Sequence, residues 1–322
     1  MKKDYPIGVV YFVTILAMFF WSCAFIWVSQ AYAIGFRPIT VVFFRLIVAS
    51  VVLTIITKFM GIKDTIKKED YKLIFFLAFA EPFCYFLGES FGMLFVSPTL
   101  ASILVSTIPL VTPIFAWMFL KEKVGLFEIV GLIVSFLGVV ILVMEDLNLE
   151  AKLIGVFLML IAVFGGTAYG ILLKLLADKY PALTITKYQT YIGVILFMPL
   201  FFIFEFNQFL GLFSQSTLRY FFPLFKYILL LGALPSSFSF TFLAVAVRRL
   251  GVVKTNIFSN LIPVFTGLMA YLILKEPFSL SKMLAMGIVV VGLFVSQMGR
   301  LTNYLVKNKT HFTELSNNIL KD

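Results

Sequence analysis

The sequence predicts an all-α integral membrane protein of ten transmembrane helices, arranged as two inverted five-helix repeats. Hydrophobic residues make up 61% of the 322 residues, charged residues make up 13%, and the mean hydropathy is +1.04. A water-soluble domain of this length needs far more polar surface. The apolar residues also fall into ten runs of about 20 residues, which is the length of a membrane-spanning helix. The second half of the chain then repeats the pattern of the first.

The ten runs are joined by short polar connections. They cover residues 7–28, 39–58, 72–94, 98–120, 126–145, 153–176, 183–205, 225–247, 253–274 and 281–299. The first run follows Met1-Lys2-Lys3 and resembles a secretory signal, with Ala31-Tyr32-Ala33 similar to a cleavage site. It is longer than the apolar core of such a signal, and the repeat needs it as a partner. We therefore interpret it as the first helix.

The basic residues predict the orientation of the helices. Most of the 26 Lys and Arg residues lie in the N-terminal segment, in the connections after even-numbered runs, and in the tail. Positively charged connections remain in the cytoplasm, so both termini are expected on the cytoplasmic side of a bacterial inner membrane. This distribution explains the net charge of +10 without a nucleic-acid partner. The tail, 300–322, is expected to be either a helix on the membrane surface or a frayed polar segment.

An offset of 154 residues aligns the sequence with itself. It places Pro109 on Pro263, Leu120-Lys121-Glu122 on Leu274-Lys275-Glu276, and Gly138 on Gly292. Each repeat holds five spans, an odd number, so the second repeat must enter the membrane upside down. We expect a first repeat at 1–147, a second repeat at 148–299 and the tail beyond. In transporters, inverted repeats enclose a site near the bilayer midplane.

The repeated pattern resembles the EamA-type transporters of the drug/metabolite transporter superfamily. The pattern is a span with a proline, then Leu-Lys-Glu, a short turn and a span with glycine, at 108–138 and again at 262–292. The resemblance implies a ten-helix secondary transporter that exports small polar metabolites such as amino acids, with proton coupling left open. Alternatives are an uncoupled facilitator or channel, a membrane enzyme or lipid-handling protein, and a structural membrane partner.

Charged residues inside the apolar runs are the first candidates for a functional site, because each costs free energy in lipid. Arg45 lies in the second run, and Glu81 and Glu89 lie in the third. Arg45 and Glu89 are expected at similar depth, either as a static ion pair or with Arg45 binding a substrate carboxylate. Glu81 is expected near the midplane. Burial disfavours a charged carboxylate, so Glu81 is either a proton-coupling residue, with Glu89 as a second candidate, or a neutral packing residue.

Polar and aromatic side chains form the second group of candidates. We predict a substrate-binding site that contains Arg45, Trp21, Ser22, Tyr85, Ser102, Ser106, Tyr169, Asn256 and Asn260. Such groups can hydrogen-bond to a polar solute or stack on it, and they also form interhelical hydrogen bonds in membrane bundles. Both interpretations stay open. Prolines bend helices, and the candidate hinges are Pro109, Pro113, Pro235 and Pro263.

Small residues predict where helices approach one another closely. The small-xxx-small sets are Gly88 and Gly92, then Ala162, Gly166 and Gly170, and then Gly131, Ser135 and Gly138. We interpret them as packing faces within a monomer.

No motif in the sequence indicates an enzyme, a cofactor or a metal site. Cys23 and Cys84 lie in apolar runs, and the single histidine, His311, lies in the tail. There is no glycine-rich phosphate loop. The expected partners are a small-molecule substrate and membrane lipids.

Overall fold

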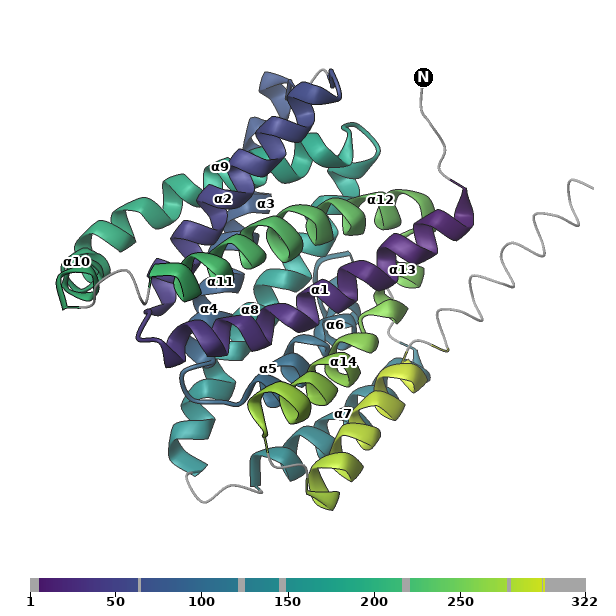
Figure 1. The fold of residues 1–322 in the computed structure, drawn as a ribbon. Coiled ribbons are helices and arrows are strands. Elements are labelled where there is room, and N and C mark those ends of the chain that lie inside the picture. The colour runs from purple at the N-terminus through teal and green to yellow at the C-terminus, as the bar shows by residue number, and fades with distance from the viewer. Residues whose placement is uncertain are drawn as a thin grey trace, which may run out of the picture.

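All regular structure in the described part of the chain is helical (Figure 1). The computed structural model describes residues 6–62, 65–120, 125–144, 149–215, 221–276, 279–296 and 298. Within these described ranges, six helices are long and apolar enough to cross a membrane, and four shorter apolar helices accompany them. The Lys121-Glu122 turn and the tail at 300–322 lie outside the described residues.

The helices follow one another with short connections, and several consist of two or three segments. Their bounds are α1 Ile7–Ala33, α2 Pro38–Phe59, η1 Lys68–Asp70, α3 Tyr71–Ala78, η2 Phe79–Cys84, α4 Tyr85–Gly92, α5 Pro98–Val105, α6 Ile108–Leu120, α7 Leu126–Met144, α8 Leu149–Ala177, α9 Ala182–Leu200, η3 Phe201–Glu205, α10 Phe206–Gln215, α11 Phe221–Ala233, η4 Leu234–Ser239, α12 Phe240–Leu250, α13 Val252–Phe258, α14 Leu261–Met269 and η5 Ala270–Leu274. A further helix, Leu280–Ser296, has no label in Figure 1.

Large apolar side chains lie on the outer surface of the bundle as well as in its core. Among them, Phe59 is 89% exposed. Arg45, Glu81 and Glu89 are buried instead. Exposed apolar surface on this scale needs a lipid environment. The structure therefore supports a multi-pass membrane protein in which Arg45, Glu81 and Glu89 lie inside the bundle.

The long helices pack in a regular scheme that mixes the two parts of the chain. In Figure 1, α1 runs between α12 and α14 and contacts both. On the other side of the bundle, α8 contacts α4 and the pair α5 and α6. The helices α2 and α9 pack directly on each other. Early and late segments of the sequence therefore alternate in space.

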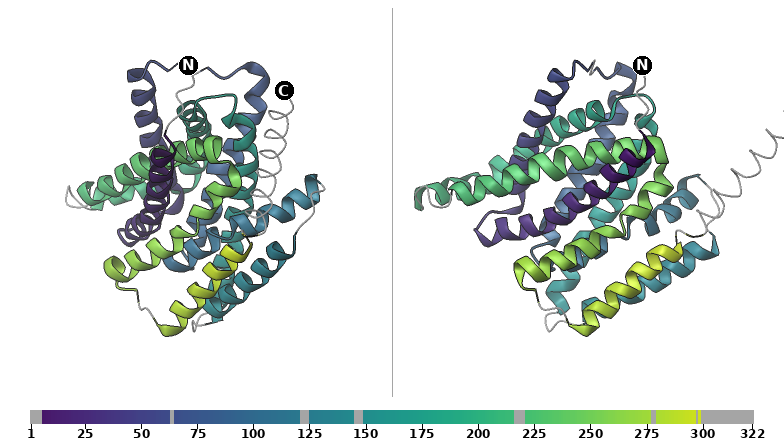
Figure 2. Two further views of the ribbon diagram at one scale, coloured as in Figure 1. Left: turned by 90° about the vertical axis from the view of Figure 1, so that its right-hand side faces the viewer. Right: turned by 45° about the vertical axis from the view of Figure 1, so that its right-hand side comes forward.

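Two helices, α7 and Leu280–Ser296, form a close antiparallel pair along one edge of the bundle (Figure 2). Gly131 of α7 meets the backbone of Gly292, and Gly138 meets Ala285 and Val289. The Ser135 hydroxyl donates a hydrogen bond of 3.1 Å to the Val289 carbonyl. The contacts confirm that small residues mark a packing face here, because a Cβ atom on either glycine would collide with the partner helix.

Replacing Gly292 with valine should destabilise the protein by about 1–3 kcal/mol, the usual cost of overpacking a tight contact. The added Cβ would strike the Ser135 side chain and backbone and the Gly131 carbonyl. The thermal unfolding midpoint of the purified protein should fall. Gly287→Val in the same helix is the matched control, because its Cβ would face open space. Equal melting of the two variants would contradict the close contact.

Prolines interrupt two of the long helices near their middles. Before Pro82 the backbone leaves helical geometry at Glu81, with φ −149° and ψ 120°. The cause is local, because a proline ring excludes the α conformation at the preceding residue. In the second helix, Pro235 lies in the π-helical turn η4, where the Ser237 hydroxyl donates to the Gly232 carbonyl at 2.8 Å. Such hydroxyls help to satisfy backbone carbonyls where a helix departs from α-helical geometry.

Two further breaks lie one turn before a proline. The helix α5 ends at Val105 and α6 begins at Ile108, just before Pro109. In the same way α13 ends at Phe258 and α14 begins at Leu261, just before Pro263. Proline cannot donate to the carbonyl four residues earlier and clashes with it. The helices therefore break at three of the predicted hinge prolines, whereas motion at these points stays a prediction.

Glu205, a buried residue of η3, caps the N-terminus of α2. Its carboxylate accepts hydrogen bonds from the Ile39 amide at 3.1 Å and from the Thr40 amide and hydroxyl at 2.6 Å each. The first amides of a helix lack partners within the helix and carry its positive dipole end. A distant segment of the chain therefore supplies the acceptor that α2 needs.

Glu205→Ala should lower the free energy of unfolding by about 2 kcal/mol or more, because three donors would lose a charged partner. Glu205→Gln should cost less, since its amide oxygen still accepts. The readout is the thermal midpoint in detergent, with the exposed Glu69→Ala as the control. A midpoint for Glu205→Ala that matches the control would show that the cap contributes nothing.

Candidate functional site

Arg45 is the centre of the candidate site. It lies in the first half of α2 and is 2% exposed. Its Nε donates a hydrogen bond of 2.9 Å to the Ser236 hydroxyl in η4, and its guanidinium carbon lies 4.2 Å from the centre of the Phe86 ring. A guanidinium over an aromatic face is a favourable cation–π contact. The side chain is thus held in place by two helices that the sequence separates widely.

The predicted direct ion pair between Arg45 and Glu89 is not found. Among the described residues, no carboxylate lies within ion-pair distance of Arg45, although Glu89 and Glu81 both act on it electrostatically. The Glu89 carboxylate instead accepts a hydrogen bond of 3.0 Å from the Tyr85 hydroxyl, one turn earlier in α4. The correction has a geometric cause: Arg45 extends toward η4 and the Phe86 ring. The cation is therefore not neutralised by direct contact.

Glu81 is the third buried charged residue, and the break in its helix positions it. Glu81 is 7% exposed, and its side chain makes no hydrogen bond within the described structure. Arg45, Glu89 and Tyr169 all lie within electrostatic range. Its predicted role as a proton carrier stays a prediction. The structure adds that the backbone is extended at this residue.

Aromatic rings connect the predicted site residues from four helices. Trp21 of α1 meets Phe240 edge-on, with ring centres 5.3 Å apart, and Tyr169 of α8 meets the same ring at 5.9 Å. Phe86, beneath Arg45, lies 5.5 Å from Tyr85 and 6.4 Å from Phe240. Trp21, Tyr85, Tyr169 and Arg45 therefore surround one aromatic cluster, and the prediction that these four lie together is consistent with this geometry.

The predicted serines are bonded to backbone rather than to one another. The Ser22 hydroxyl donates to the carbonyls of Met18 at 2.8 Å and Ile262 at 3.1 Å, so it joins α1 to α14 next to Pro263. Ser102 and Ser106 donate to carbonyls of their own helix at 2.8 Å each. These bonds favour the packing interpretation for the serines over substrate binding.

The predicted asparagines lie in the second half of the chain. Asn260 is buried at the start of α14, and Asn256 lies in α13. The side chains of Asn256 and of Pro113 lie outside the part that the structure describes. A solute-binding role for Asn260 remains a prediction.

Sequence reasoning missed four residues of this region. Ser236 and Phe86 hold Arg45, Phe240 joins the aromatic rings, and Pro82 breaks the helix at Glu81. Of these, Pro82 could have been recognised, because a mid-span Glu-Pro pair predicts an extended residue. The other three depend on contacts between distant helices.

A polar cluster joins the connection between α8 and α9 to the start of α3. The Asp70 carboxylate accepts hydrogen bonds from Lys179 Nζ at 2.8 Å and from the Tyr180 hydroxyl at 2.6 Å. The Tyr180 hydroxyl also accepts from the Lys67 amide at 3.2 Å. The hydrogen bond to Asp70 raises the pKa of Lys179. The cluster fixes the connection between α8 and α9 against the loop that precedes α3.

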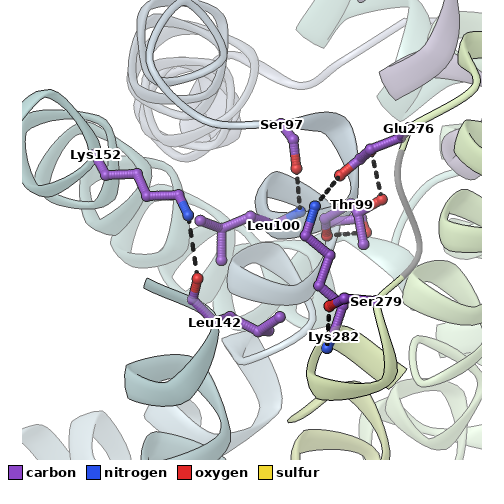
Figure 3. Close-up of polar contacts among 9 residues, drawn as sticks. Ser97, Thr99, Leu100, Leu142, Lys152, Glu276, Ser279 and Lys282 are labelled. Atoms are coloured by element: carbon purple, nitrogen blue, oxygen red, sulfur yellow. Dashed lines mark hydrogen bonds and ion pairs between the residues drawn. The ribbon is translucent and has the colours of Figure 1, made fainter. Parts of the chain in front are cut away.

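A second cluster joins α5 to the segment after η5 (Figure 3). The Thr99 hydroxyl donates to the Glu276 carboxylate at 2.9 Å, and Lys282 Nζ lies 3.6 Å from the same carboxylate. Nearby, Lys152 Nζ donates to the Leu142 carbonyl at 3.1 Å near the end of α7 (Figure 3). The first contacts thus join the start of α5 to the segment after η5, and the last one joins α8 to the end of α7.

The site has no metal-binding character in the part that the structure describes. No three His, Cys, Asp or Glu side chains gather there in a way that could hold a metal ion. The chemistry that remains is one cation, two carboxylates and aromatic hydroxyls inside an apolar bundle. Such a set can bind a polar solute or a proton.

Apolar spans around a buried charged centre define the class as a multi-pass membrane protein with an internal polar site. Two segments, residues 8–144 and 153–298, match the profile of the EamA-like transporter family. These segments cover most of the chain, and the protein belongs to the EamA-like transporter family.

Similar proteins carry the same general description. An uncharacterised transporter of Archaeoglobus fulgidus is 25% identical over 284 residues, which is 87% of this chain and 95% of the relative. The uncharacterised transporter YetK of Bacillus subtilis is 25% identical over 261 residues, 78% of this chain and 76% of YetK. A chain of known crystal structure gives a TM-score of 0.66 at 13% identity and covers 90% of this chain and 97% of its own, which shows the same fold. These names indicate a transporter rather than an enzyme.

Proposed function

We propose that the protein is a secondary transporter that exports small polar metabolites, such as amino acids, by alternating access around the Arg45 site. Arg45 carries the proposal. It is a buried cation whose one hydrogen-bond partner among the described residues is Ser236. A buried charge without a contacting counter-charge is costly. A solute carboxylate that arrives at the free Nη groups would offset this cost.

The proposed architecture is ten spans in two inverted repeats, 1–147 and 148–299. The pair of α7 and Leu280–Ser296 supports it. Ser135 bonds to Val289, which is 154 residues away, the same offset that aligns the two halves of the sequence. That offset also converts the contact of Gly131 with Gly292 into the contact of Ala285 with Gly138, and both contacts occur. Antiparallel helices related in this way fit a two-fold axis in the membrane plane.

The contacts of α1 and α8 give independent support. If the two repeats are interchanged, α1 corresponds to α8 and α12 corresponds to α4. The contact of α1 with α12 then corresponds to that of α8 with α4. The contact of α1 with α14 likewise corresponds to that of α8 with α5 and α6. All of these contacts are present. The breaks at Pro109 and Pro263 likewise lie at equivalent places, which suits two equivalent gates.

We place both termini in the cytoplasm and the protein in the inner membrane of a bacterium, because the basic connections favour that side. Glu81 is the proposed proton-coupling residue. It is buried, it has no hydrogen-bond partner in the described structure, and it lies within range of Arg45. A proton on Glu81 would then change the charge that the solute meets at Arg45.

Proteoliposomes test the proposed function. Purified protein is reconstituted, and the exchange of radiolabelled amino acids, sugars and nucleosides across the membrane is measured with and without a pH gradient. We expect saturable exchange of at least one zwitterionic solute. We also expect a pH gradient to drive accumulation of this solute in the vesicles. Exchange without accumulation would support an uncoupled facilitator. The absence of exchange for every solute would contradict the proposed transport.

A further inference from the structure

Two buried polar atoms beside Glu81 lack hydrogen-bond partners among the residues that the structure describes. They are the Tyr169 hydroxyl oxygen in α8 and Oε1 of Gln189 in α9. Both residues are 2% exposed. The two side chains approach each other without forming a hydrogen bond of good geometry. Unpaired buried polar atoms are costly and rare in folded proteins, so their presence points to a ligand.

Close backbone contacts place the two side chains on the same side of the Glu81 break. A Cβ on Gly165 of α8 would lie 2.8 Å from the Ala80 carbonyl, and a Cβ on Gly193 of α9 would lie 2.5 Å from the Pro82 ring. Tyr169 follows Gly165 by one turn, and Gln189 precedes Gly193 by one turn. Because the two helices are antiparallel neighbours in the chain, both side chains lie at one depth. Glu81, just before Pro82, lies within electrostatic range of Tyr169.

We propose that Glu81, Tyr169 and Gln189 form a subsite for a primary ammonium group of the solute. The three side chains offer a carboxylate, a hydroxyl oxygen and an amide oxygen, and a primary ammonium carries three N–H donors. This subsite rests on the proposed transport function, because it assigns the positive end of the solute. The negative end then reaches Arg45, which also lies within electrostatic range of Glu81.

Neither of the two atoms forms a hydrogen bond that joins helices in the described structure. Tyr85, by contrast, donates its hydroxyl to Glu89, and Tyr191 pairs with Thr54. The subsite is also compatible with proton coupling at Glu81. A proton and an ammonium group exclude each other at a single carboxylate, so loading of one would release the other.

Recognition by three acceptors predicts strong selectivity for N–H donors. A quaternary ammonium keeps the positive charge but leaves all three acceptors unpaired. Sites that hydrogen-bond a substrate N–H group reject analogues that lack it by large factors, here expected to be about 100-fold or more. A sodium ion is the remaining small cation, and it needs more oxygen ligands than these three side chains supply.

The test uses thermal stabilisation of the purified full chain by methylammonium, tetramethylammonium and sodium, all as chloride salts. We expect methylammonium alone to stabilise the protein in a saturable way. Gln189→Leu and Tyr169→Phe should each weaken this effect about tenfold or more. Gln189→Glu should strengthen it, which a general loss of structure cannot do. Tyr191→Phe and the exposed Gln208→Leu are the matched controls.

Equal stabilisation by methylammonium and tetramethylammonium, stabilisation by sodium alone, or no stabilisation by methylammonium would each overturn the subsite. These failures are distinct from failure of the proposed function. If proteoliposomes exchange solutes with and without a primary amine equally well, the proposed transport function stands and the proposed subsite is contradicted. Methylammonium binding without exchange of any solute would keep the subsite and remove transport.

Discussion

Arg45→Met should reduce solute exchange by about 100-fold or more, the loss expected when one member of a buried charged interaction is removed. Methionine fills a similar volume over the Phe86 ring but offers neither charge nor hydrogen bonds. The bond to Ser236 would also be lost. The measurement is the initial rate of solute exchange in proteoliposomes, at matched protein content.

Ser236→Ala makes this prediction specific, because it frees the guanidinium without removing its charge. We expect a loss of about tenfold, the cost of one hydrogen bond to a charged group. The exposed Arg248→Met serves as the control for removing an arginine. Exchange by Arg45→Met at the rate of the Arg248 variant would show that Arg45 is only a packing residue.

Glu81→Gln should abolish accumulation driven by a pH gradient, whereas exchange of solute for solute should persist at solute concentrations high enough to offset weaker binding of the solute ammonium group. Glutamine keeps the size and hydrogen-bonding capacity of the protonated acid but cannot release a proton. The comparison of the two modes in one preparation separates coupling from folding. In the Glu81 variant the accumulation ratio should fall to about 1, the value without coupling.

Glu150→Gln, at an exposed position in α8, is the control for this experiment. Glu89→Gln addresses the second candidate, and we expect it to retain accumulation because Glu89 is hydrogen-bonded to Tyr85. Full accumulation by Glu81→Gln would show that coupling depends on a residue other than Glu81.

The sequence alone was sufficient for the helical class and for the positions of long helices such as α2. The expected run 39–58 corresponds to α2, Pro38–Phe59, because hydrocarbon length and hydrophobicity set both ends of a span. The prolines also predicted the breaks before Ile108 and Leu261, because the effect of a proline on a helix is local. Local chemistry of this kind needs no knowledge of neighbouring helices.

The partners of the site residues could not be predicted. Arg45 was expected to pair with Glu89 at similar depth, but depth leaves the rotation of each helix undetermined. The rotation of α2 directs Arg45 to Ser236 in η4. The small-residue pattern has the same limit: Gly88 packs against α8, whereas a Cβ added at Gly170 would meet no described atom within 4 Å. Which face of a helix meets a neighbour depends on the whole bundle.

The cap of Glu205 on α2 has a consequence for motion. The Glu205 carboxylate, from the second half of the chain, accepts hydrogen bonds from the first turn of α2, from the first half. The helix α2 also packs against α9. We therefore expect α2 and α9 to move together as one rigid unit. Any motion that opens or closes the bundle would then keep α2 and α9 in this unit, which contains helices from both halves of the chain.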